Sequence, residues 1–93
     1  MNNFTDSDGL AAIEVAKSIS ARAKETAIIR LFGIAQIFYR QPVGERAADE
    51  LAALIGPDAT CAMFYIYGLS GGLFPIESWA KIVCIESHGA PLQ

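Results

Sequence analysis

The sequence has few of the residues that mark the common classes of functional site. Its 93 residues include two cysteines, one histidine and one tryptophan, and only 18% are charged. Valine and threonine occur three times each, so isoleucine is the one abundant β-branched residue, whereas alanine occurs 15 times. Few β-branched residues and an excess of alanine favour helix over strand. The composition therefore predicts an all-α protein.

The cysteines and the histidine provide little material for a metal or redox site. Cys61 and Cys84 are 23 positions apart and form no C-x-x-C pair. Cys84 and His88 have the i,i+4 spacing at which two side chains of one helix can share an ion, but a zinc site needs two further ligands. No other residue has a suitable spacing. We therefore expect free thiols, no metal and no cofactor.

Apolar residues, in contrast, are in excess, at 53% of the chain. A domain of this size buries only about 60–65% of the surface that its unfolded chain exposes. The chain is too apolar for disorder, yet it carries more apolar residues than one small core hides. We expect residues 1–9 to be a polar segment and residues 10–93 to form a single helical domain. We also expect a protein partner or self-association, as a homo-oligomer, to cover the exposed apolar surface.

The hydrophobic pattern predicts about four helices in a compact bundle. Residues 10–41 contain no proline and one glycine, and they form the longest helical candidate. Their apolar stripe changes face near residues 25–28, so this first helix is either kinked there or continuous with two buried faces. A short amphipathic helix is predicted over residues 45–55, ending at Gly56, and a last helix begins after Pro75.

Residues 59–69 are apolar on every side, so periodicity alone does not distinguish helix from strand. The preceding Pro57-Asp58 favours a buried helix, because proline fits a first helical position and aspartate fits the positive helix end. Residues 59–76 lack charge, but glycine and proline interrupt their second half, and the continuous part is too short to span a membrane. Residues 1–6 lack the features of a signal peptide, which predicts a cytoplasmic location.

Residues 51–62 resemble a helix-turn-helix motif. The resemblance implies a DNA-binding regulator that acts as a dimer. Residues 59–69 would then be the recognition helix, but they contain no Arg, Lys, Asn or Gln to read bases and phosphates. The positions that match the motif are Leu51, Ala52, Ile55 and Gly56.

Residues 68–72 match the G-x-S-x-G pattern of hydrolase nucleophile elbows, with Ser70 in the place of the nucleophile. That scaffold needs a large parallel sheet, which a short chain that favours helix does not supply. Leu73-Phe74-Pro75 follows in place of a helix start. We therefore interpret the segment as an interhelical loop and expect no catalytic activity, because no acid, base and nucleophile share a credible spacing.

These observations predict a small non-catalytic protein-binding module. It would be an inhibitor, adaptor or assembly subunit that occupies a site on a larger protein, and an inhibitor encoded by a phage or mobile element is one such role. Aromatic residues dominate interface energies, so the candidate interface residues are Phe64, Tyr65, Tyr67, Phe74 and Trp79, each of which also suits a core position.

The alternative is the DNA-binding regulator, although nucleic acid is the less expected partner because the net charge is −3. Its phosphate contacts would come from a basic face on the long helix. If the protein does not bind DNA, this face is an ordinary solvated surface. The residues of this candidate basic face are Lys17, Arg22, Lys24 and Arg30.

Overall fold

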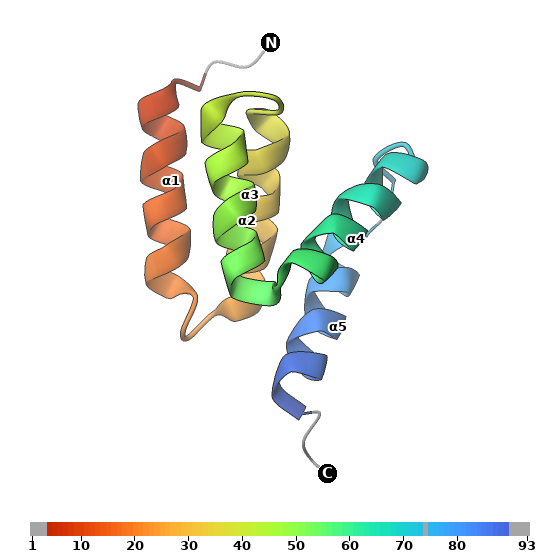
Figure 1. The fold of residues 1–93 in the computed structure, drawn as a ribbon. Helices are drawn as coiled ribbons and strands as arrows, with labels where there is room; N and C mark the ends of the chain where they lie inside the picture. Colours follow the sequence, from red (N-terminus) through yellow and green to blue (C-terminus); the bar gives the residue numbers. More distant parts are fainter. Residues whose placement is uncertain (1–3, 74, 90–93) are drawn as a thin grey trace.

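A computed structural model describes the backbone of residues 4–73 and 75–89, with side chains described as far as Cys84. Every regular element in these residues is an α-helix, and the molecule is compact, which confirms the all-α prediction (Figure 1). There is one helix more than the expected four. The helices are α1 (Asp6–Ile19), α2 (Lys24–Ile37), α3 (Pro42–Ile55), α4 (Pro57–Leu69) and α5 (Ile76–Gly89).

The additional helix arises because the predicted long helix over residues 10–41 is broken. The chain turns at residues 20–23, earlier than the change of apolar face suggested, and a continuous helix is therefore wrong. The amides of Arg22 and Ala23 both donate to the carbonyl of Ile19, at 3.1 and 2.7 Å. These two hydrogen bonds close a tight turn without proline or glycine, and α2 then runs back along α1.

The first helix begins at Asp6, inside the segment of residues 1–9 that was predicted to be a polar lead. The Thr5 hydroxyl accepts a hydrogen bond from the Asp8 amide at 3.1 Å, and the Asp8 carboxylate accepts one from the Thr5 amide at 3.0 Å. This reciprocal pair is a capping box, which satisfies two backbone donors that a helix start leaves free. The polar residues thus belong to the helix cap and the first turn.

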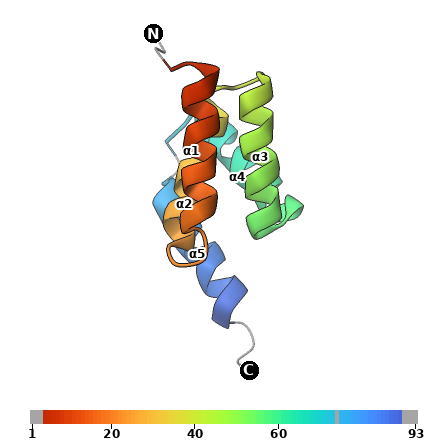
Figure 2. The same cartoon turned by 90° about the vertical axis from the view of Figure 1, so that its left-hand side faces the viewer.

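The helices α1, α2 and α3 form an antiparallel three-helix bundle in which α2 contacts both of the others (Figures 1 and 2). The centre of the core is α2, where Ile28, Leu31 and Phe32 are all at most 3% exposed. Ile13 of α1 and Leu51 of α3 pack against them and are fully buried. Burial of each such side chain stabilises the fold by about 1.5–3 kcal/mol.

The remaining two helices lie on the side of the bundle away from α1 (Figure 1). Residues 59–69 are helical, as favoured, and α4 begins at Pro57, but the helix is not buried as expected, since only Thr60 and Met63 are buried. A single residue, Gly56, ends α3 and starts α4. The last helix, α5, packs on α2 and contributes Ala80 and Val83 to the core. In the described part of the chain, no helix combines the length and the hydropathy that a membrane crossing requires.

Candidate protein-binding groove

The most apolar helix, α4, also has the smallest share of buried residues among helices α1 to α4. Asp58 is the one charged residue among its 13 residues, yet only Thr60 and Met63 are buried. In the bundle, by contrast, α2 has six buried residues among 14. A helix that is apolar on all sides is normally enclosed by protein. The position of α4 therefore leaves apolar surface uncovered.

Three side chains of α4 hold it on the bundle. Met63 is fully buried in the core. The Phe64 ring lies 4.7 Å from the Phe32 ring of α2, and the Tyr67 ring meets Phe32 edge-on at 5.0 Å, as measured between ring centroids. Such aromatic pairs contribute about 0.5–1.5 kcal/mol beyond the area that they bury. Further contacts join α4 to α3 and α5, and the side that carries Tyr65 and Leu69 is left in water.

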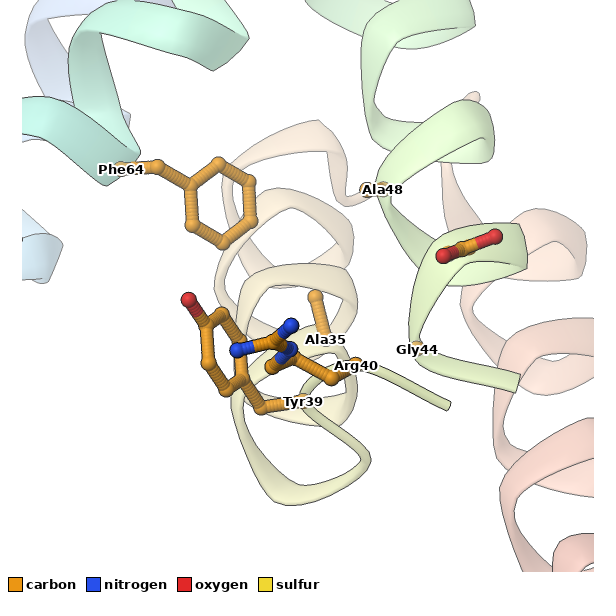
Figure 3. A pocket seen from close by; sticks show the side chains of 7 residues that line it. Ala35, Tyr39, Arg40, Gly44, Ala48 and Phe64 are labelled. Atoms are coloured by element: carbon orange, nitrogen blue, oxygen red, sulfur yellow. The ribbon is translucent and has the colours of Figure 1, made fainter. Parts of the chain in front are cut away.

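Three open hollows of about 280, 450 and 370 Å³ lie beside α4, and Phe64 lines all three. Residues of α3 line the first and the third, whereas the second is lined by the end of α2, by α4 and by the loop that follows α4. In Figure 3 the rings of Phe64 and Tyr39 lie on one side of the first hollow, and α3 forms the other side with Gly44 and Ala48. We call this surface the α3–α4 groove. Its remaining lining residues are Ala35, Gln36, Arg40, Glu45, Asp49, Ala52, Pro57, Thr60, Cys61, Tyr67, Gly68, Gly71 and Gly72.

The wall that α3 contributes consists of small side chains. Ala48 and Ala52 are one turn apart on the groove side. At the start of α3, Gly44 packs so closely on the end of α2 that a Cβ there would collide with the carbonyl oxygen of Phe38. The turn before α3 contains Arg40 at φ 62°, a left-handed conformation that is uncommon outside glycine. The end of the groove beside Arg40 and Gly44 is thus built on a tight backbone contact between α2 and α3.

The charged groups of the groove are two carboxylates and one guanidinium. Glu45 and Asp49 are exposed and line the groove from α3, and Arg40 lines it from the α2–α3 turn. The ion pairs in the described residues join Lys17 to other carboxylates, those of Glu14 at 3.7 Å and Glu50 at 3.5 Å. Glu45 and Asp49 are in neither of these ion pairs, and both also line the hollow beside α1 together with Arg46.

A second apolar area lies on the outer side of α4 and the segment that follows it. Tyr65, Leu69 and Leu73 are 69%, 71% and 86% exposed. On α5, Ile82 is also more than half exposed. Large apolar side chains are also exposed elsewhere in the described residues, at Phe4, Leu10, Val15, Ile37 and Tyr39.

The candidate interface residues fall into different environments. Tyr65 is exposed, whereas Phe64 and Tyr67 are half-buried, with one part of each on α2 and another on the groove. Trp79 is half-buried and packs against the core. Phe74 lies outside the described residues. Sequence reasoning did not identify Tyr39 or the small residues of α3.

The candidate basic face does not lie on one helix, because the break in residues 20–23 divides it. Lys17 on α1 is paired with Glu14 and Glu50, and Arg22 in the turn donates to the Ser18 carbonyl at 3.4 Å. Lys24 is half-buried at the start of α2, and Arg30 is exposed on that helix. The one-residue connection between α3 and α4 is also shorter than the three or four residues of a helix-turn-helix turn.

The other polar motifs occupy ordinary structural positions. The Ser70 hydroxyl donates to the Tyr67 carbonyl at 3.0 Å, and Gly71 and Gly72 have positive φ angles, as in a loop after a helix end. Across the described residues, no group of three or more His, Cys, Asp or Glu side chains is placed to hold a metal ion. The side chain of His88, the suggested partner of Cys84, lies outside the described residues.

The two thiols differ in their surroundings. Cys61 is exposed on the groove, and Cys84 is half-buried on α5. Burial raises the pKa of the Cys84 thiol above its ordinary value of 9.0; nearby Lys24 lowers this pKa to a smaller extent and Glu25 raises it. Cys61 therefore provides a chemical probe of the groove, with Cys84 as an internal reference.

Comparison of the chain with protein-family models, curated proteins and solved structures found no match. A fold alone does not specify a function. The functional argument therefore depends on the surface chemistry of α4 and of the groove beside it.

Proposed function

We propose that this protein is a small non-catalytic binding module that contacts another protein through α4 and the surfaces beside it. The observation that supports this proposal is the contrast within α4, which is apolar on every side but has two buried residues among 13. Apolar area removed from water stabilises a complex by about 25 cal/mol per Å² before the costs of association. An inhibitor, an adaptor and an assembly subunit all use a surface of this kind.

Site-specific photo-cross-linking tests this proposal. A photoreactive phenylalanine analogue at Tyr65 places the probe on the exposed side of α4, and the same analogue at Thr26 places it on an exposed position of α2. We expect a defined protein adduct, with a partner or with a second copy of the chain, from position 65 and none from position 26. Equal labelling at both positions, or none at either, would contradict binding through α4.

The alternative function, a DNA-binding regulator, predicts that the protein shifts DNA in a gel, whereas a protein-binding module would not. A gel-shift titration at low and moderate salt separates the two functions, because phosphate contacts release counterions and make binding salt-sensitive. We expect no shift at micromolar protein. A salt-sensitive shift that Arg22→Ala and Arg30→Ala abolish would favour the regulator, since both residues belong to the candidate basic face.

A further inference from the structure

We propose that α4 is a flap, which lifts off the bundle about glycine hinges at its two ends while the three-helix bundle stays folded. The movement belongs to this chain alone. It also regulates how much of the apolar surface of α4 is open to a partner, and in that respect it rests on the proposed function. Three features of the helix support the movement: its joints, its contacts and its burial.

Glycine residues form the joints at both ends of α4. Gly56 is the single residue between α3 and α4 and adopts φ 95°, and Gly71, in the loop after α4, adopts φ 67°. A Cβ built at either position would meet nothing within 4 Å, so neither joint is packed against another part of the molecule. Because glycine has access to more backbone conformations than other residues, the direction of α4 changes most easily at these two points.

The contacts that hold α4 on the bundle are apolar. The Phe64 and Tyr67 rings lie 4.7 and 5.0 Å from the Phe32 ring, and Met63 belongs to the same core cluster. Other residues of α4 contact α3 and α5. In the part of the chain that the structure describes, no ion pair joins α4 to another helix, whereas one at 3.5 Å joins α1 to α3. The first step of opening therefore separates side chains and breaks no hydrogen bond inside α4.

The bundle keeps most of its core without α4. Its fully or almost fully buried side chains include Ile13, Leu31 and Leu51, one from each of its helices. In contrast, α4 has two buried residues among 13. The last helix, α5, has its own contacts with α2, so it remains in place when α4 moves. A local opening that gives up few buried contacts costs less free energy than global unfolding.

An open flap enlarges the apolar surface that the protein offers. Phe32, which is 3% exposed in the closed form, loses the cover of two rings, and the inner side of α4 faces solvent together with its outer side. A molecule that binds apolar surface has more of it to contact in the open form. Such a partner would therefore shift the equilibrium toward the open form.

Native-state hydrogen exchange of the full chain tests the flap. A helix of 13 residues is marginal in water once it leaves its neighbours, so the amides of an open α4 exchange with solvent. We expect amides in the middle of α4 to exchange at least about tenfold faster than those in the middle of α2. Equal protection of the two helices would overturn the proposal.

Two tyrosines of α4 provide a matched pair of variants. Tyr67→Ala removes the edge-on contact with Phe32 and should speed the exchange of α4 about tenfold. Tyr65→Ala makes the same change at a position that is 69% exposed and should alter that rate by less than about twofold. Equal effects of the two variants would show that α4 melts by itself without leaving the bundle, and would overturn the proposal.

A third variant separates local opening from global unfolding. Ile13→Val weakens the bundle at a fully buried position and should speed the exchange of α2 about fivefold. The rate in α4 should change by less than about twofold, because Ile13 stays packed when the flap opens. Acceleration of both helices by the same factor would show that α4 opens only when the bundle unfolds, which would overturn the proposal.

The hinge itself is tested at Gly56. Gly56→Ala disfavours the positive φ of the closed form and should speed the exchange of α4 about tenfold, because the open form relieves this strain. Gly33→Ala, at a glycine of α2 without a positive φ, should leave α4 within about twofold of its original rate. No effect of Gly56→Ala would overturn the assignment of the hinge.

Failure of the flap is distinguishable from failure of the proposed function. Equal protection of α4 and α2, in a chain that still gives the adduct from position 65, would overturn the flap and leave the function standing. Fast local exchange of α4 without any α4-dependent adduct would support the flap and contradict the function.

Discussion

The three-helix bundle and the α4–α5 pair differ in how they bury apolar sequence. In the bundle, α2 packs against α1, α3 and α5 and leaves little of Ile28, Leu31 and Phe32 in water. In the pair, α4 is more apolar than α2, but it has fewer buried residues and exposes Tyr65 and Leu69. The comparison shows that a helix's place in the fold, more than its apolar content, determines its burial.

The largest effect is expected in the bundle core. Leu31→Ala removes a side chain that is 1% exposed at the centre of α2 and should lower the free energy of unfolding by about 2–5 kcal/mol, through lost burial and the cavity left behind. Urea denaturation followed by circular dichroism measures this loss. If the loss were under 1 kcal/mol, the bundle would not be the source of stability.

A smaller loss is expected at the junction of α2 and α3. Gly44→Ala forces a methyl group against the Phe38 carbonyl, and backbone does not move aside easily, so the variant should lose about 1–3 kcal/mol. Gly33→Ala is the matched control, because a Cβ there meets nothing within 4 Å and alanine is the better helix former. It should gain about 0.5–1 kcal/mol. The same denaturation experiment should therefore give opposite signs for the two glycines.

A still smaller change is expected on the outer side of α4. Tyr65→Gln and Leu69→Gln replace apolar groups that are already in water, so each should change the free energy of unfolding by less than about 0.5 kcal/mol. With the photoreactive analogue at position 65, Leu69→Gln should lower the yield of the cross-linked adduct, because it removes apolar contact area. A large loss of stability in these variants would show that α4 is covered within the monomer and would remove the contrast with the bundle.

The smallest effect concerns the pH dependence at Cys84. Because its pKa is raised by burial, the unfolded chain releases the thiol proton near pH 9.0 before the folded chain does. Stability should therefore fall as the pH rises from 9.0 through the higher folded pKa. Cys84→Ala should show a shallower fall than the unsubstituted chain in thermal melts above pH 9, and Cys61→Ala serves as the control. Equal slopes for the two variants would contradict this assignment.

The sequence predicted the helices that have clear start signals and an apolar stripe. Pro57 and Pro75 led to correct assignments of α4 and α5. The break between α1 and α2 was predicted too late in the chain, because residues 20–23 contain neither glycine nor proline and only the change of apolar face indicated a break.

The groove was harder to predict than the helices. Its aromatic side, Phe64 and Tyr67, was among the candidate interface residues because aromatic residues favour interfaces. Its other side consists of Ala48 and Ala52, whose role depends on the direction in which α4 leaves α3. No sequence pattern specifies that direction. The carboxylates Glu45 and Asp49 were not among the candidate residues, because tertiary geometry decides which exposed residues border a concave surface.

The single glycine that joins α3 to α4 influences how the surface between these helices could change in evolution. Gly56 adopts φ +95°, and a Cβ at this position would meet no atom within 4 Å, so only the backbone preference of the new residue opposes its replacement. A tilt of about 20° at this one residue would displace the far end of a 20 Å rod by about 7 Å. Such a tilt would also move Phe64 and Tyr67 away from Phe32, so the angle between α3 and α4 depends on these ring contacts as well as on the glycine joint.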